Sequence, residues 1–229
     1  MIGLGGRGVM GLGLGRSSVA AAAVPWWLAG GAPTPVAAYQ PIGAASLAAS
    51  YVNLANPGTN DAAPGVAPTF DAATGWFFDV STQYLVTGVV PSSLAWSMIV
   101  RVYSYTAMSY VAIAGASTGT TGNARFALWA QSIPSAVGYI NGGLREKAPR
   151  LDSNGGVLAV AGNQGYRNGI SDGAVFTQGT QTTNAIVIGK DSRYLTMYGL
   201  NGIISAIAIY GTTLDAAQVA QISAAMAAL

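Results

Sequence analysis

The chain has 229 residues, of which only 8% are charged, and its ten basic and eight acidic side chains leave a net charge of +2. That balance gives no electrostatic reason to expect nucleic acid as a partner. Histidine and cysteine are absent and Glu146 is the only glutamate. A Ser-His-Asp or Cys-His nucleophile, zinc held by those residues, disulfides and a two-glutamate glycosidase are therefore excluded. We expect a chain that is not an enzyme and that binds no cofactor.

Residues 1–34 are predicted to form an arm in front of a domain over residues 35–229. Glycine is interspersed with Leu, Ile, Val and Met up to residue 15, and an alanine run then leads to Trp26 and Trp27. A segment whose side chains are this small cannot form a hydrophobic core of its own. We expect an extended arm that buries both tryptophans against a neighbouring subunit or against its own domain, with a cleaved secretion signal as the alternative. The apolar run 19–28 is shorter than the ~20 residues of a membrane span.

From residue 39 onward, apolar and polar residues alternate over short runs separated by turn residues, which indicates many antiparallel strands. The expected strands are residues 75–78, 83–87, 97–105, 110–114, 124–131, 136–140, 157–161, 165–168, 185–188 and 202–210. Asn-Gly pairs that begin at Asn141, Asn154, Asn168 and Asn201 favour tight hairpin turns between strands.

Only the C-terminal end of the chain has helical spacing. Its apolar positions are Leu214, Val219, Ile222, Met226 and Leu229. Thr212, followed three residues later by Asp215, predicts a capping box at the start of this helix. The chain is thus predicted to be an all-β sandwich closed by one short C-terminal helix.

A series of short motifs supports this fold by family resemblance. They are GWFFD at residues 75–79, QYL at 83–85, SMIV at 97–100, GYRNG at 165–169, IG at 188–189 and GIISAIAIY at 202–210. In this order, from Pro35 to the C-terminus, the chain resembles the concanavalin A-like lectin and laminin G-type jelly roll. Val80 stands where the resemblance leads us to expect glycine, and Ala206 where an acidic residue is usual. The resemblance implies the sandwich and is compatible with sugar binding, but not with hydrolysis, because the glucanase branch needs a pair of glutamates.

Strand alternation predicts an outward face that carries aromatic and arginine side chains. In residues 97–105, Met98, Val100 and Val102 share one face, and in residues 124–131 so do Phe126 and Leu128. The opposite face is predicted to carry a single platform for stacking on sugar rings or on a partner protein. Its candidate residues are Arg101, Tyr103, Tyr105, Tyr110, Arg125, Trp129 and Tyr139. The alternatives are cross-strand pairs on a solvated sheet, or rings covered by the N-terminal arm.

The charged residues gather in one segment, which holds Arg145, Glu146, Lys147, Arg150 and Asp152. We expect a solvated loop there, and the functional alternatives are a contact site for an anionic glycan or a salt-bridge network between subunits. The carboxylates available for a rim calcium are Asp79, Asp152, Asp172 and Asp191. They show no dense acidic spacing, so no metal site is expected.

So few charges suit a subunit packed in an assembly, because a free monomer relies on charged surface for solubility. The cysteine-free chain with its Gly-Leu-Gly-Leu arm is also similar to proteins of tailed-phage particles. We therefore expect a virion structural protein, such as a capsid decoration, fibre or adhesion subunit, that contacts other virion proteins and copies of itself and displays a lectin-like sandwich toward a cell-surface glycan. The alternative is a free, secreted carbohydrate-binding module.

Overall fold

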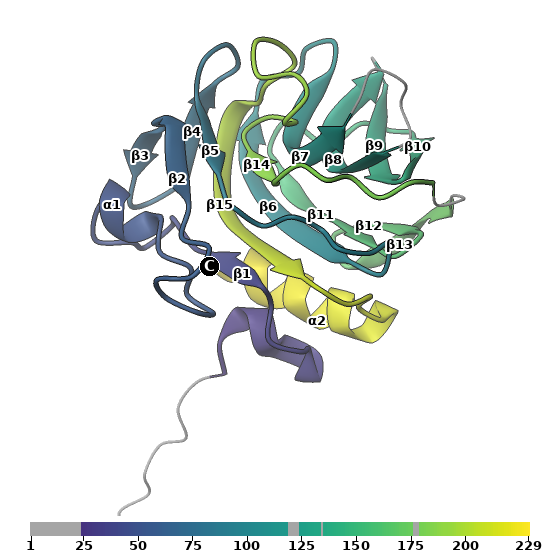
Figure 1. Cartoon of the computed structure of the whole chain (residues 1–229), viewed down its shortest axis with the longest axis horizontal. Coiled ribbons are helices and arrows are strands. Elements are labelled where there is room, and N and C mark those ends of the chain that lie inside the picture. Colours follow the sequence, from purple (N-terminus) through teal and green to yellow (C-terminus); the bar gives the residue numbers. More distant parts are fainter. Residues whose placement is uncertain (1–23, 119–123, 134, 176–178) are drawn as a thin grey trace, which may run out of the picture.

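The computed structural model describes residues 24–118, 124–133, 135–175 and 179–229, and shows two antiparallel sheets packed face to face (Figure 1). The first sheet has the strand order β13 (Ile170–Val175), β12 (Gln164–Arg167), β11 (Gly156–Ala161), β6 (Ser97–Tyr105), β15 (Asn201–Tyr210), β4 (Gly75–Asp79) and β3 (Thr69–Asp71), and β1 (Ala37–Tyr39) also pairs with β15. The second sheet has the order β10 (Gly143–Lys147), β9 (Ala136–Asn141), β8 (Ala124–Ile133), β7 (Val111–Thr118), β14 (Val187–Ile188), β5 (Tyr84–Val86) and β2 (Ala63–Val66). The predicted all-β sandwich is confirmed.

The main core lies between the two sheets. Side chains point alternately to the two faces of a strand, so every second side chain of each strand lies in this core. Met98, Val100 and Val102 of β6 are buried there, as are Phe126 and Leu128 of β8, in agreement with their predicted inward face. Because both sheets contribute large apolar residues to this layer, the interface between them buries the side chains that the period-two pattern singled out.

A second apolar layer covers the outer face of the first sheet (Figure 1). The C-terminal helix α2 (Ala216–Ala227) buries Val219, Ile222 and Met226 against Ile99 and its neighbours on this face. Its capping box pairs Asp215 with Gln218, three residues later than the predicted Thr212–Asp215 pair. The predicted apolar positions of the helix are confirmed. Its predicted start is wrong, because the chain becomes helical only after residue 215.

The tryptophans of the predicted arm pack on this same layer. Trp26 opens the 3-10 helix η1 (Trp26–Gly31), is buried beneath α2 and donates its indole Nε1–H to Gln40 Oε1 at 2.8 Å. Tyr210 of β15 donates to the carbonyl of Trp27 at 2.8 Å. The two rings were expected to pack either against a neighbouring subunit or against the chain's own domain. The structure shows them packed against the chain's own domain. The predicted boundary at residue 35 stays a prediction, and residues 1–23 lie outside the described part of the chain.

Several local expectations are corrected. Residues 145–147 belong to strand β10 rather than to a loop, since they pair with β9. Asn201 opens β15 opposite Asp79 and makes no turn, whereas Asn168 and Gly169, both at positive φ, form the tight turn between β12 and β13. Four short strands (β1, β2, β3 and β13) and the helix α1 (Leu47–Ser50) had no clear sequence pattern. None of the helices in the described ranges is long and apolar enough to cross a membrane.

Candidate functional site

The predicted aromatic platform is divided between the two outer faces of the sandwich. Arg101 and Tyr103 follow Ile99 at alternate positions of β6 and lie on the outer face of the first sheet. Arg125 and Trp129 lie on the outer face of the second sheet, where Trp129 packs with Ala112 and Ile140. Because the outer faces of the two sheets point in opposite directions, these residues cannot form one surface.

Two of the predicted outward residues, Tyr105 and Tyr139, point into the core instead. The pairing of β6 with β15 skips Tyr103, and this bulge reverses the alternation, so Tyr105 turns inward and donates to the carbonyl of Leu151 at 2.6 Å. Tyr139 lies directly opposite Leu128 across the β8–β9 pair. Opposed residues in an antiparallel pair share a face, so Tyr139 is buried with Leu128.

Four aromatic rings gather over the outer face of the second sheet. Trp129 is only 5% exposed because Tyr194 and Tyr198 cover it, with ring centroids at 5.9 and 6.2 Å. Tyr110 meets Trp129 edge to face at 6.3 Å and Tyr198 at 5.2 Å, and it remains 40% exposed. These separations are typical of favourable aromatic pairs. Tyr110 therefore forms the accessible rim of the cluster, and Trp129 its buried base.

The segment that carries Tyr194 and Tyr198 is anchored by polar contacts. Lys190 is fully buried and its ammonium donates to the carbonyls of Ser81 and Leu195. Burial lowers the pKa of Lys190, against the attraction of Asp79. The amide of Ala112 on β7 donates to the Tyr198 carbonyl at 2.8 Å. These contacts hold the two tyrosines over the sheet.

Two of the three tyrosines in this cluster have strained backbones. Tyr110 has a φ of 62° and Tyr198 a φ of 57°, a left-handed conformation that bulky side chains rarely adopt. Such outliers persist only where the surrounding structure enforces them, and they gather at ligand sites. Their occurrence in two rings that touch each other marks this place as a candidate site.

A hollow of about 380 Å³ opens beside these rings. Tyr110, Trp129, Tyr194 and Tyr198 line it on one side. Strand β10 supplies Leu144 and Glu146, which point to the same side of the strand because they are two residues apart. Ser132 of β8 donates to Glu146 Oε1 at 2.7 Å. The only glutamate of the chain, predicted to sit in a solvated loop, is therefore part of the wall of this hollow.

Two donors in the wall have no partner among the described residues. They are the indole Nε1–H of Trp129 and the Nε–H of Arg125, both buried. Arg125 uses Nη2 to donate to the Tyr194 hydroxyl at 3.3 Å and places its guanidinium 5.9 Å from that ring. The hollow thus combines an exposed ring, unpartnered donors and a carboxylate, which is the mixture that polar organic ligands need.

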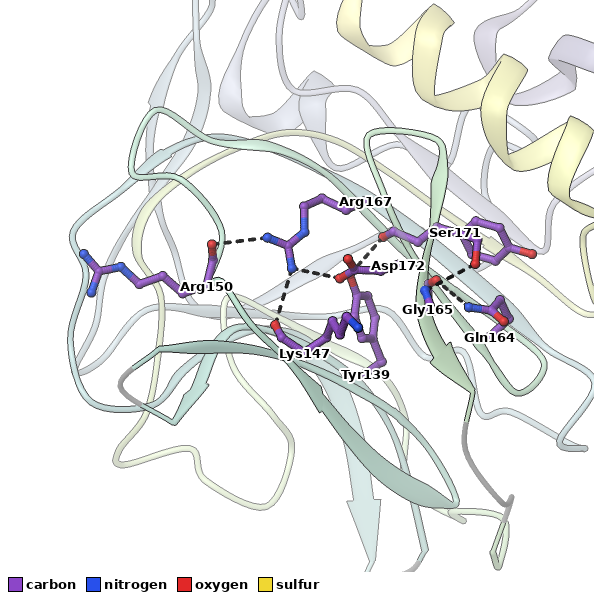
Figure 2. Close-up of polar contacts among 10 residues, drawn as sticks. Tyr139, Lys147, Arg150, Gln164, Gly165, Arg167, Ser171 and Asp172 are labelled. Atoms are coloured by element: carbon purple, nitrogen blue, oxygen red, sulfur yellow. Dashed lines mark hydrogen bonds and ion pairs between the residues drawn. The ribbon is translucent and has the colours of Figure 1, made fainter.

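A second polar cluster lies where β12, β13 and β9 meet (Figure 2). Arg167 Nη2 is 2.8 Å from Asp172 Oδ2, and the Tyr139 hydroxyl donates to the same oxygen at 2.8 Å. Burial, reinforced by Asp172, raises the pKa of Tyr139 well above its usual range. This tyrosine therefore stays neutral and acts as a hydrogen-bond donor in the core.

The four aspartates considered for calcium serve separate local roles. Asp79 accepts from the amides that follow it, at Thr82 and Gln83. Asp152 accepts from the Asn154 amide, Asp172 binds Arg167, and Asp191 accepts from the Ser117 hydroxyl at 2.8 Å. Within the described ranges, no three acidic side chains gather in a way that could hold a metal ion.

Tyr194 and Tyr198 are the site residues that sequence reasoning missed. Their segment has neither strand nor helix periodicity, and they reach Trp129 across some sixty-five positions of chain. The one local sequence feature that could have pointed to them is a pair of tyrosines four residues apart, next to Arg193, in a stretch without regular pattern. In the structure, the Arg193 guanidinium lies 5.0 Å from the Tyr194 ring.

No protein-family model and no curated protein sequence matches this chain. Among solved structures, it is similar to the Trypanosoma rangeli sialidase in complex with 2,3-difluorosialic acid (TM-score 0.60, 12% identity, 82% of this chain and 32% of the sialidase). It is also similar to Domain 4 of AbnA, a GH43 extracellular arabinanase from Geobacillus stearothermophilus, in complex with arabinotriose (TM-score 0.55, 18% identity, 83% of this chain and 98% of that domain). The chain spans about a third of the sialidase. At these identities the likeness is one of fold.

These similarities correct the prediction that the chain is not an enzyme. Proteins with a similar fold include two glycoside hydrolases, a sialidase and an arabinanase, the latter through its Domain 4. The prediction, which rested on the lack of histidine and of a second glutamate, is therefore not upheld.

Proposed function

We propose that this domain binds glycans, in the hollow beside Tyr110 on the outer face of the second sheet. The observation that carries the proposal is the exposed Tyr110 ring, held at a strained φ, next to the unpartnered Trp129 and Arg125 donors and to Glu146. The apolar face of a sugar ring can stack on an aromatic ring such as Tyr110. Sugar hydroxyls both donate and accept hydrogen bonds, so they match the guanidinium of the half-buried Arg125 and the carboxylate of Glu146.

The size and charge of the hollow also suit a sugar. Its volume of about 380 Å³ falls within the range of ~300–1,000 Å³ that small-molecule sites occupy. Glu146 and Arg125 bring one negative and one positive charge to its lining. A neutral sugar fits this balance better than an acidic one, because the repulsion between Glu146 and a carboxylate offsets the attraction that Arg125 exerts on it.

The comparisons support this proposal at the level of the fold. Domain 4 of the arabinanase, whose whole length the chain nearly covers, was solved in complex with arabinotriose. The predicted place of this chain in a virion has no such support, and both that place and the secreted alternative stay predictions. Glycan binding is compatible with each of them.

The proposal is tested by calorimetric titration of the full chain with arabinotriose, preceded by a glycan array to find tighter ligands. We expect Tyr110→Ala to weaken binding by roughly 1–3 kcal/mol, as the loss of an aromatic anchor commonly does. Glu146→Gln is expected to weaken it as well, since the carboxylate is the stronger acceptor.

Phe77→Ala is the matched control, because the Phe77 ring is 39% exposed against 40% for Tyr110 and lies on the first sheet, between the inward-facing Trp76 and Phe78. Equal losses in the two variants would show that the hollow is not the site. A wild-type chain that binds no glycan on the array would refute glycan binding itself.

A further inference from the structure

The Asn-Gly pairs of the chain carry a chemical reactivity as well as a preference for turns. The backbone nitrogen that follows an asparagine can attack the side-chain carbonyl carbon, and glycine leaves this nitrogen unshielded because it has no side chain. The reaction needs a carboxamide that is free to rotate and a backbone that can open locally. The pairs begin at Asn141, Asn154, Asn168 and Asn201. The fold places these pairs in four different environments.

Asn141 is fully buried, and its side chain is fixed by hydrogen bonds. Its Nδ2 donates to the carbonyl of Leu94 at 2.8 Å and to that of Gly162 at 2.9 Å. The amide of Gly142 donates to the Arg125 carbonyl at 2.6 Å. Rotation of the carboxamide would leave buried carbonyls without their donors, which is costly. The core therefore protects this pair.

Asn168 is exposed, but hydrogen bonds to strand β11 hold it at two points. Its Oδ1 accepts from the Val157 amide at 2.8 Å, and its own amide donates to the Val157 carbonyl at 2.7 Å. Gly169 lies against helix α2, where a Cβ on it would stand 3.0 Å from the Ala220 Cα. The carboxamide is therefore fixed, and the backbone that follows it has little room to move.

Asn201 and Gly202 form the start of strand β15 and pair with neighbouring strands. Asn201 lies opposite Asp79 of β4, while Gly202 lies opposite Phe78 of β4 on one side and Tyr105 of β6 on the other. Attack by the Gly202 nitrogen requires the chain to leave the extended conformation, and so to break its pairing with both strands. The sheet therefore protects this pair.

Asn154 lies in the turn that leads into β11, where its side chain is exposed. Within the described ranges, its carboxamide makes no hydrogen bond, and its backbone amide donates to Asp152 Oδ1 at 2.8 Å. The amide of Gly155 donates to the Asp152 carbonyl, also at 2.8 Å. These two bonds belong to a solvated turn, and such turns open locally while the rest of the domain stays folded. Of the four pairs, this one needs the smallest rearrangement to react.

We propose that Asn154 is a site of spontaneous covalent modification, at which water converts the side-chain amide into a carboxylate. The Gly155 nitrogen loses its proton and forms a bond to Cγ of Asn154, and the carboxamide nitrogen leaves as ammonia. Water then opens the resulting succinimide ring. Cleavage between the nitrogen and Cγ gives aspartate. Cleavage between the nitrogen and the backbone carbonyl carbon gives isoaspartate, in which the main chain runs through the side chain.

Both products add a negative charge at a hollow on the outer face of the first sheet. The hollow, of about 460 Å³, is lined by Asn154 and Arg101, and Arg101 is the only charged side chain among the described residues of its wall. Arg101 Nη1 is buried and has no hydrogen-bond partner in the described part of the chain. The new carboxylate therefore attracts a guanidinium to which the wall of the hollow offers no acid.

The two products differ in their effect on the fold. Gly155 approaches β6 so closely that a Cβ on it would stand 2.1 Å from the Val102 carbonyl oxygen. Aspartate keeps the length of the main chain and therefore keeps this approach. Isoaspartate adds one carbon to the main chain directly before Gly155. We expect this extra carbon to push Gly155 away from β6 and to loosen the start of β11.

Incubation of the full chain for several weeks in mildly alkaline buffer, followed by peptide mapping with mass spectrometry, tests the proposal. A parallel incubation in urea is the control, because unfolding removes the four environments. In urea we expect the four pairs to react at rates within about threefold of each other, since little persistent structure distinguishes them. In the folded chain we expect Asn154 to react at least about tenfold faster than each other pair. Isoaspartyl methyltransferase then labels the isoaspartate, a product that only the cyclic route gives.

Asn154→Gln is the matched variant, because it keeps an exposed amide but has a longer side chain that closes the corresponding ring far more slowly. Aged wild type is expected to gain an acidic form on ion-exchange chromatography, and aged Asn154→Gln is not. Asn154→Asp reproduces one product and should melt at the wild-type temperature. The isoaspartate form, isolated from aged wild type, should melt at a lower temperature.

Several results would overturn the proposal. These are a folded chain in which another Asn-Gly pair reacts as fast as Asn154, and a folded chain in which Asn154 stays intact although it reacts in urea. Equal amounts of the acidic form in aged wild type and in aged Asn154→Gln would do the same. An isoaspartate form that melts with wild type would refute the expected loosening of β11.

Discussion

Replacing Trp129 by alanine should reveal whether the tyrosines of the 191–199 segment cover it in solution. A freely exposed ring on a sheet would cost little stability when removed. Here the ring is 5% exposed and packs against Tyr110, Tyr194 and Tyr198. Truncation of a buried Trp costs about 3–5 kcal/mol. Its unpartnered indole N–H costs ~1–3 kcal/mol while buried, and the substitution removes that cost. The difference between the midpoints of these two ranges is about 2 kcal/mol, so we expect the free energy of unfolding to fall by roughly 1–3 kcal/mol.

The measurement is urea unfolding at 25 °C, followed by circular dichroism because the chain has five tryptophans. Phe126→Ala, in the core between the sheets, is the buried reference and should lose about 3–5 kcal/mol. Trp129→Phe keeps a ring and removes the unpartnered N–H, so it should lose less than half as much as Trp129→Ala. A Trp129→Ala variant within about 0.5 kcal/mol of wild type, as for a surface change, would refute the packing described above.

Three further outcomes follow from the packing and the polar contacts. Trp26→Ala should lower the free energy of unfolding by about 3–5 kcal/mol in the same urea assay, since the ring is buried beneath α2, and an unchanged midpoint would contradict that packing. Lys190→Met should cost about 1–3 kcal/mol by leaving two carbonyls unpartnered, and proteolysis should then cut the 191–199 segment faster; equal cutting rates would argue against the anchor. Burial opposes ionisation of Asp79, but hydrogen bonds from Thr82, Gln83 and Ser81 outweigh it and lower its pKa, so its stabilising contribution is present above pH ~4 and is lost on acidification below that. Asp79→Asn should therefore flatten the loss of stability between about pH 4 and 2, and a pH profile identical to wild type would contradict this reasoning.

The fold class and most of the inner layer could be predicted from the pattern of residues along the chain. Period-two alternation is a local property of a strand, so it placed Met98, Val100, Phe126 and Leu128 on an inward face without any knowledge of neighbouring strands. Helical spacing did the same for the apolar side of α2, and the Asn168-Gly169 pair marked a hairpin turn because its backbone favours positive φ.

How the outward residues combine depends instead on contacts between distant parts of the chain. Alternation separates the two faces of one strand but does not say which sheet the strand joins, so Arg101 and Trp129 were expected together and lie on opposite faces of the sandwich. A bulge set by pairing with β15 turned Tyr105 inward, and a distant segment covered Trp129 with Tyr194 and Tyr198. The candidate site beside Tyr110 depends on such contacts between residues far apart in the chain, and these contacts have no periodicity from which a sequence could reveal them.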